Sequence, residues 1–327
     1  MSISRRTALG GLLVAGIAGP LRAADWPTHA MSWLVPFPPG GSNDIFARPV
    51  AAHVGERLGQ PVVVDNRGGA GGTIGGMVAA RSAPDGYTLL VGNTGLTFAN
   101  VVYAESGFDL QRDFTALSLL ARVPVALVVN PAKVAAKDLA GFLAAARKAP
   151  GTINIGSSGL GTIPHLAIEL LQQRAGIRLN HVPYRGGGQA LQDVVSGQID
   201  AMFTPLSTIV SYVQSGRLRA LAVASRQRQP ILPDLPTFTE VGVADFRVSS
   251  WYGLFAPKAT PAAPIDILHG AIQAALGSDD IKKIWAEQGA TVTLESRQAF
   301  ADFVTEEVAR WTAIAKVTGI PDRKSVV

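Results

Sequence analysis

Cysteine is absent from the 327-residue sequence, and its absence removes several classes of site at once. Disulfide bridges, thiolate nucleophiles, thiolate metal sites and a lipid attached to an N-terminal cysteine all require this residue. The five histidines form neither an H-E-x-x-H pattern nor another zinc spacing, and no serine lies within G-x-S-x-G. Because nothing nominates a nucleophile or a metal ligand set, we expect a protein that is not an enzyme and has no cofactor.

Charged residues are also scarce, at 16% of the chain, and the excess of positive charge lies at the N-terminus. Arg5, Arg6 and Arg22 fall within the first 23 residues, which hold no acidic residue, and without these three arginines the formal charge of +5 falls to +2. The remaining chain has no run of lysine and arginine and no alternation of basic with aromatic residues. It therefore lacks the basic patch that binds nucleic acid or a membrane surface.

The uncharged run at the N-terminus, residues 7–19, is shorter than the about 20 apolar residues that a transmembrane helix needs. Arginines precede this run, and Pro20 and the small residue Ala23 follow it, as in an export signal. We therefore predict that residues 1–23 are a signal peptide, cleaved near Ala23 and Ala24, and that the mature protein resides in the periplasm.

The export route stays open between two systems. Arg5 and Arg6 with Leu9 resemble the twin-arginine signal, which directs folded proteins across the membrane. Ala8 and Gly10 depart from that signal, so the general secretory (Sec) route remains an alternative.

Apolar residues make up 47% of the chain and are spread along its length, which indicates a globular protein. The chain is longer than one hydrophobic core supports, so we expect two lobes. Short β-rich runs alternate with helical stretches, and this rhythm predicts an α/β fold with parallel sheets covered by helices. The expected strands cover residues 33–35, 62–64, 87–91, 126–129, 153–155, 181–182, 201–203, 221–224 and 249–257, and the expected helices cover residues 45–58, 72–81, 139–147, 166–175, 190–196, 264–276 and 299–317.

The stretch of residues 115–129 is too long and too apolar for one ordinary strand, which suggests a segment that leaves one lobe and enters the next. A second crossing is expected near residues 249–251. The predicted domains are a discontinuous first lobe, residues 24–124 plus 250–327, and a continuous second lobe, residues 125–249.

Two Gly/Ser loops, residues 37–42 (the first loop) and residues 157–162 (the second loop), each lie between an expected strand and helix, one in each lobe. The first N–H groups of a helix are unpaired and carry the positive end of the helix dipole, so such a loop can bind an oxyanion without a basic side chain. Two such loops facing each other would clamp an anion. The alternative is ordinary turn chemistry, with Ser42 and Thr162 as helix caps.

Other polar residues near these loops have two interpretations each. His165 can donate to a ligand or be a packed or capping histidine, and Asp44 is better suited to hold its loop than to act as a general acid. Arg185 can meet a carboxylate or remain a solvated charge at the rim. A third glycine-rich run, residues 68–76, does not fit G-x-G-x-x-G, because Ile74 stands where the last glycine is needed. Close packing of loop and helix is its expected role.

A series of short motifs runs through the chain in a fixed order. They are VPFPPGG (35–41) with Asp44, LGQPVVVDNR (58–67) with GAGG (69–72), PDGYTLL (84–90), Gly161-Thr162 with His165-Leu166, VPY (182–184) with Gly186, LRALAV (218–223), LPDLPT (232–237) and WYGLFAP (251–257). In this series the chain resembles the substrate-binding proteins of tripartite tricarboxylate transporters, also called the Bug or TctC family. The resemblance covers essentially all of the mature chain.

The resemblance implies a two-lobed periplasmic-binding-protein fold of type II, with two crossovers and a ligand cleft between the lobes. It implies a monomeric receptor that captures a small carboxylate by closing its lobes and delivers it to a two-subunit membrane permease. Some relatives act instead as ligand-sensing partners of sensor kinases, and that alternative stays open. An exported α/β hydrolase is a further alternative, but it would need a nucleophile, base or metal set in the cleft.

In the family, the ligand carboxylate is held largely by backbone and hydroxyl groups of the two loops, often through water. The ligand-binding residues implied are Phe37, Pro38, Gly40, Gly41, Ser42, Asp44, Asn93, Thr94, Ser157, Ser158, Gly159, Gly161, Thr162, His165, Tyr184, Phe203 and Thr204. Specificity is expected from Asn93, Thr94, Phe98, Phe203, Thr204 and Pro205. Many relatives carry an acidic or other polar residue where this chain has Thr204, so we expect a carboxylate without an amino group, aromatic or dicarboxylic.

Overall fold

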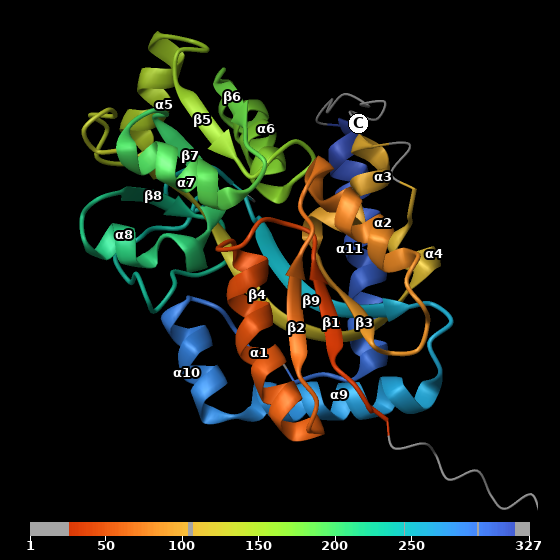
Figure 1. Ribbon diagram of the computed structural model, residues 1–327. Coiled ribbons are helices and arrows are strands. Elements are labelled where there is room, and N and C mark those ends of the chain that lie inside the picture. The colour runs from red at the N-terminus through yellow and green to blue at the C-terminus, as the bar shows by residue number, and fades with distance from the viewer. Residues whose placement is uncertain (1–25, 104–106, 245, 293, 318–327) are drawn as a thin grey trace, which may run out of the picture.

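The computed structural model describes residues 26–103, 107–244, 246–292 and 294–317. The predicted signal peptide, residues 1–23, lies outside the described residues. Within the described part of the chain, no helix combines the length and the apolar character that crossing a membrane requires. The fold is mixed α/β, as the sequence predicts, and its two lobes are stacked in Figure 1.

The first lobe is built on a sheet that combines parallel and antiparallel strands. Strands β1 (Met31–Val35), β2 (Val62–Asn66) and β3 (Thr88–Asn93) are parallel, and β9 (Ser249–Pro257) runs antiparallel between β3 and β4 (Phe114–Val129). The helices of this lobe are α1 (Ser42–Leu58), α2 (Thr73–Ala80), α3 (Ala99–Val102), α4 (Leu110–Asp113), α9 (Ala262–Gly277), α10 (Asp279–Glu287) and α11 (Arg297–Val317), with 3-10 turns η1 (Ala70–Gly72) and η2 (Thr94–Thr97). In Figure 1, α1 lies in front of this sheet and α11 behind it.

The second lobe continues the same sheet. Its strands are β5 (Asn154–Ser157), β6 (Asn180–Pro183), β7 (Ala201–Pro205) and β8 (Arg219–Val223). Its helices are α5 (Leu139–Lys148), α6 (Ile163–Ala175), α7 (Gly187–Ser196) and α8 (Val210–Gln214), with the 3-10 turn η3 (Leu206–Thr208). β5 is parallel to β6 and β7, while β4 is antiparallel to β7 and β8. The described strands form one path in the order β2-β1-β3-β9-β4-β7-β5-β6, with β8 also on β4.

Strand β4 belongs to both lobes. It is a single strand of 16 residues, whereas the sequence analysis regarded this stretch as too long for one strand. β4 pairs with β9 as far as Pro124, and from Val125 onward it pairs with β7 and β8 instead. Because its partners change along its length, each half of this long strand pairs with the strands of one lobe only.

Most expected helices and strands are present, with bounds shifted by a few residues. Helix α10 is the main addition, because its sequence is largely charged and only two apolar side chains in it are buried. Ile281 and Trp285 are four residues apart and therefore lie on one face of the helix, where they pack against the core. Ile284, partly buried, completes an i, i+3, i+4 spacing with them, but this pattern covers little more than one turn and is too short to stand out in the sequence.

Candidate functional site

A cavity of about 680 Å³ lies between the two lobes. It is bordered by both Gly/Ser loops, by the ends of β3 and β7 and by the first residues of three helices. Of the residues predicted from the sequence, those that line it are Phe37, Pro38, Gly40, Gly41, Ser42, Asn93, Thr94, Ser158, Thr162, Phe203, Thr204 and Pro205. The structure thus brings residues from distant parts of the chain together at one cavity.

Three helix N-termini meet at this cavity. Helices α1, α6 and α7 begin after Gly41, Thr162 and Gly186, and all three of these residues line the cavity. None of the three caps its helix with a side-chain hydrogen bond, because two are glycines and the Thr162 hydroxyl donates to the Gly159 carbonyl instead, at 2.7 Å. In α1 the Asp44 N–H is bonded to the Gly41 carbonyl, and Pro164 of α6 has no N–H, but the other N–H groups of the first turns, with the positive ends of three helix dipoles, are suited to an anion.

The cavity lining carries no formal charge. Among the described residues that border it, none is Asp, Glu, Lys, Arg or His. An anionic group in the cavity would therefore be stabilised by N–H groups, hydroxyls and amides, while a cationic group would find no carboxylate partner. This lining favours carboxylates over amines.

The first loop is held from behind by an ionised carboxylate. The Oδ2 of Asp44 accepts from the Gly40 N–H at 3.2 Å and from Arg48 Nε at 2.8 Å, and its Oδ1 accepts from Asn66 Nδ2 at 3.0 Å. Asn66 Nδ2 also donates to the Phe37 carbonyl, at 2.9 Å. Burial by itself raises the pKa of Asp44, but the hydrogen bonds from Arg48, Asn66 and Gly40 outweigh it, and the pKa is lowered. Asp44 does not line the cavity and supports the loop that does.

The second loop is held by hydroxyls and two imidazoles. Ser157 Oγ lies 2.7 Å from His181 Nε2 and accepts from the Gly159 N–H at 3.1 Å. His165 Nδ1 accepts from the Gly161 N–H at 3.2 Å. Burial lowers the pKa of His165 to about 3, with a smaller contribution from His181, and burial lowers the pKa of His181 to about 4. Both rings are therefore neutral near pH 7.

Several predicted site residues lie behind the cavity rather than on its wall. Ser157, Gly159, Gly161 and His165 form the internal hydrogen bonds of the second loop and do not line the cavity. Tyr184 also lies outside the lining. Its hydroxyl donates to Asp193 Oδ2 at 2.7 Å.

Burial raises the pKa of Tyr184 to about 12, and the hydrogen bond with Asp193 acts in the same direction. Phe98, expected to set specificity, is buried and packs near Trp311 at a centroid distance of 6.4 Å. Arg185 is also outside the lining. Neither Phe98 nor Arg185 is therefore placed to touch a molecule in the cavity.

Eight further polar residues line the cavity and were not predicted from the sequence. These residues are Gln189 and Gln192 of α7, Ser207, Thr208, Ser211 and Tyr212 after β7, and Ser250 and Tyr252 of β9. Burial raises the pKa of Tyr252 to about 12, so its hydroxyl stays protonated. One signal was available: Gly186-Gly187-Gly188 stands between a strand and a helix, which is the pattern that identified the other two loops.

The third glycine-rich run packs against other loops and does not line the cavity. A Cβ at Gly71 would lie 2.9 Å from the Leu160 carbonyl oxygen of the second lobe and 2.9 Å from the Tyr103 ring. The Tyr103 hydroxyl donates to the same carbonyl, at 3.1 Å. A Cβ at Gly186 would lie 3.0 Å from Pro38. Glycine thus permits close contact between the lobes at both of these places.

A known protein family matches most of the chain. The model of the TctC family, described as the tripartite tricarboxylate transporter family receptor, matches residues 46–320. The chain is also 36% identical over 323 residues to the protein BugT of Bordetella pertussis, and that alignment covers 98% of this chain and 99% of BugT.

Solved structures give the same result at the level of the fold. The protein Rpa4515 of R. palustris, solved with adipate, has a TM-score of 0.88 and 35% identity, and the match covers 91% of this chain and all of that one. MatC of Rhodopseudomonas palustris, solved with malate, has a TM-score of 0.84 and 33% identity, over 89% of this chain and all of that one. Both are bound to a small dicarboxylate.

Proposed function

The chain belongs to the tripartite tricarboxylate transporter receptor family, and on that premise we propose that it captures a carboxylate without an amino group in the cavity between its lobes. The observation that carries this proposal is the meeting of three helix N-termini, none with a side-chain cap, at a cavity whose described lining has no charged side chain. Such a site supplies hydrogen-bond donors to a carboxylate. It supplies no carboxylate to an ammonium group.

The preference against amino acids rests on the wall formed by the end of β7. Thr204 and Pro205 line the cavity there, and the Thr204 hydroxyl lies 2.7 Å from that of Thr208. An ammonium group at this wall would lose its hydration and gain only neutral hydroxyls, which is unfavourable. A second carboxylate can take its hydrogen-bond donors from the helix N-termini that also border the cavity, and an aromatic ring or a hydroxyl group carries no charge to desolvate. The relatives solved with adipate and malate hold ligands of the first kind.

The predicted ligand-binding residues divide into two groups under this proposal. The residues on the cavity wall contact the ligand directly or through water. Asp44, Ser157, Gly159, Gly161, His165 and Tyr184 support the wall from behind, because their hydrogen bonds are made within the protein.

The cellular role that we propose follows from the family. The receptor acts as a periplasmic monomer after removal of residues 1–23, and it delivers its ligand to a two-subunit membrane permease. Its lobes are residues 24–124 with 250–327, and residues 125–249. The change of partners in β4 between Pro124 and Val125 supports the first boundary, and the pairing of Pro124 with Ser249 supports the second.

Calorimetric titration of the mature protein, unfolded, dialysed and refolded to remove bound ligand, tests the proposal. The panel contains adipate, malate, succinate, benzoate, aspartate and glutamate, with adipamide as the uncharged control for adipate. A ligand at a hundredfold excess over Kd should stabilise the fold by about 2.7 kcal/mol in a parallel melting experiment. Saturable binding of a plain carboxylate supports the proposal. Tighter binding of aspartate or glutamate than of every plain acid, or equal binding of adipamide and adipate, contradicts it.

A further inference from the structure

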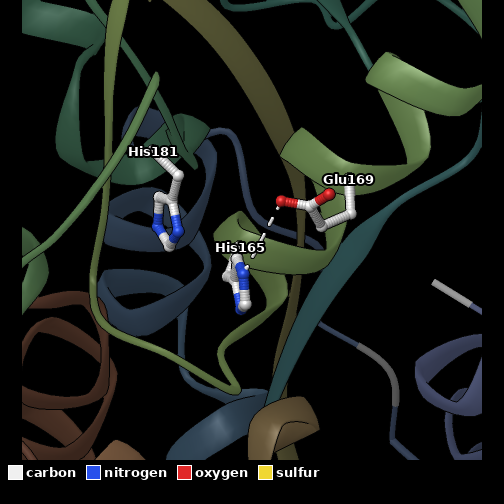
Figure 2. Close-up of side chains that lie close together, drawn as sticks. All are labelled: His165, Glu169 and His181. Atoms are coloured by element: carbon white, nitrogen blue, oxygen red, sulfur yellow. Dashed lines mark ion pairs between the residues drawn. The ribbon is translucent and has the colours of Figure 1, made fainter. Parts of the chain in front are cut away.

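Behind the second loop, His165, Glu169 and His181 form a cluster of metal-ligating side chains (Figure 2), with one ligand atom from each within 4.8 Å of the others. The two rings, however, are stacked, with centroids 4.3 Å apart and planes inclined by 13°. A metal ion binds imidazole nitrogen in the plane of the ring, and two nearly parallel planes do not share a point at bonding distance from both nitrogens. The cluster therefore does not fit a metal ion as it stands.

Hydrogen bonds give the cluster a different role. The Nδ1 of His165 accepts from the Gly161 N–H, so in the neutral ring the proton is on Nε2, which lies 3.8 Å from Glu169 Oε1. The Nε2 of His181 contacts Ser157 Oγ at 2.7 Å. One imidazole thus holds the end of the second loop and the other holds its start. The stacked rings link the two attachments directly.

The loop held in this way includes two glycines in unusual backbone conformations. Gly159 and Gly161 have φ angles of +127° and +67°. Glycine adopts these and many other backbone conformations without strain, so hydrogen bonds to the loop are needed to hold the observed ones. The chain then leads into Thr162, the N-cap of α6, which lines the cavity. The charged and titratable side chains that face the imidazole pair in the described structure are Glu169 of α6 and each imidazole itself, and burial raises the pKa of Glu169.

We propose that His165 and His181 are positioning residues for ligand binding, which fix the second loop so that the N-terminus of α6 faces the cavity. The inference rests on the proposed function, since it assigns a role in the same site. Neither imidazole touches the ligand, because neither lines the cavity. Their effect is transmitted through Gly161 and Ser157.

Matched substitutions test the proposal by removing an acceptor and then restoring it. His165→Leu removes the acceptor for the Gly161 N–H, while His165→Asn keeps an oxygen at the position of Nδ1. His181→Leu and His181→Gln form the corresponding pair for Ser157. Binding of adipate and malate is measured by calorimetry at pH 7, and the amide proton shift of Gly161 is measured by NMR in every variant.

We expect both Leu variants to bind at least tenfold more weakly than the wild type, and the Asn and Gln variants to bind within about threefold of it. The wild type should also lose more affinity between pH 6 and pH 4 than the His165→Asn/His181→Gln double variant. Titration of the ligand itself is common to both proteins and cancels in this comparison. The Gly161 amide shift should move in His165→Leu and return in His165→Asn.

Three outcomes overturn the inference. Wild-type affinity in both Leu variants contradicts positioning while leaving the proposed function intact, and so does failure of the Asn and Gln variants to restore binding when they melt like the wild type. A melting temperature raised by stoichiometric Zn²⁺ in the wild type but not in His165→Asn identifies a metal site instead. If the refolded wild type binds no member of the carboxylate panel, the proposed function itself fails.

Discussion

The first and second loops border the same cavity from opposite lobes, and their supports differ in charge. Behind the first loop, the ionised Asp44 is paired with Arg48 and accepts a backbone N–H. Behind the second loop, neutral His165 and His181 take the corresponding positions. Arg48 is half exposed, whereas His165 is almost fully buried. The first support is therefore ionic and near water, and the second is neutral and enclosed.

This difference indicates two ways of presenting a helix N-terminus to an anion. A charged residue near water keeps its state over a wide pH range, because ionisation is favoured by its partners. A buried imidazole is accommodated only while it is neutral, and its protonation at low pH destabilises the folded protein. The supports of the two loops should therefore be lost under different conditions of pH and substitution.

Acid gives the largest expected effect, and it acts on the second loop. The pKa values of His165 and His181 are lowered to about 3 and about 4, so between pH 6.5 and pH 4 the unfolded chain binds protons that the folded chain does not. The free energy of unfolding should fall by up to about 1.4 kcal/mol per pH unit for each imidazole. Urea unfolding at several pH values measures this slope. A slope that is unchanged in the His165→Asn/His181→Gln variant would show that other groups cause it.

Alanine substitution of one glycine in each loop should lower the free energy of unfolding by different amounts at neutral pH. Gly161 has a φ of +67°, and a Cβ there would lie 2.9 Å from Val102. We expect Gly161→Ala to lower the free energy of unfolding by about 2–4 kcal/mol, from strain and overpacking together.

The matched control is Gly41→Ala, because Gly41 has a φ of −87° and a Cβ there would lie 3.8 Å from the nearest atom, the Pro38 carbonyl oxygen. Its effect should stay below about 1 kcal/mol, the cost of replacing glycine by the poorer cap alanine at the N-terminus of α1. Equal losses of stability in the two variants, measured by urea unfolding at pH 7, would remove the distinction between the loops.

Removing the charge of Asp44 should lower the free energy of unfolding by less than Gly161→Ala does. Asp44→Asn weakens hydrogen bonds with Arg48 and Gly40, and we expect a loss of about 1–3 kcal/mol at pH 7. The pKa of Asp44 is lowered below its usual value of 3.8, so this loss should persist at pH 5 and shrink only at more acidic pH. Asp138→Asn is the control, since Asn caps α5 as well as Asp does. A loss that already disappears at pH 5 would argue against an ionic support.

The hydrogen bond between Tyr103 of the first lobe and Leu160 of the second loop should have the smallest effect when it is removed. Tyr103→Phe removes the hydrogen bond to the Leu160 carbonyl, which connects the first lobe to the second loop. We expect binding of the tightest carboxylate to weaken by about two- to fivefold, in line with about 0.5–1 kcal/mol for one hydrogen bond. Tyr184→Phe, whose hydroxyl bonds within the second lobe, serves as the comparison. An affinity loss that is larger in Tyr184→Phe would mean that contact between the lobes contributes little.

The sequence predicted the α/β class and both Gly/Ser loops because these depend on local patterns. Glycine and serine between a strand and a helix are visible within a few residues, and the structure places both loops at the cavity. The sequence also predicted that Asp44 holds the first loop, which its hydrogen bonds confirm, but the imidazole pair behind the second loop could not be predicted in the same way. His165 and His181 come from different elements, and only the folded β5–β6 register brings His181 beside the second loop. The polar wall around Ser250 was missed because β9 reads as a core strand.

Strand β9 also determines the order in which the molecule can be assembled. It lies between β3 and β4, although the entire second lobe is synthesised between β3 and β9. Because residues 125–248 are made first, β3 keeps an unpaired edge, of the kind that pairs with other chains, until β9 is added. Because β9 also carries Ser250 and Tyr252 to the cavity, the cavity wall is complete only once β9 has taken its place in the sheet.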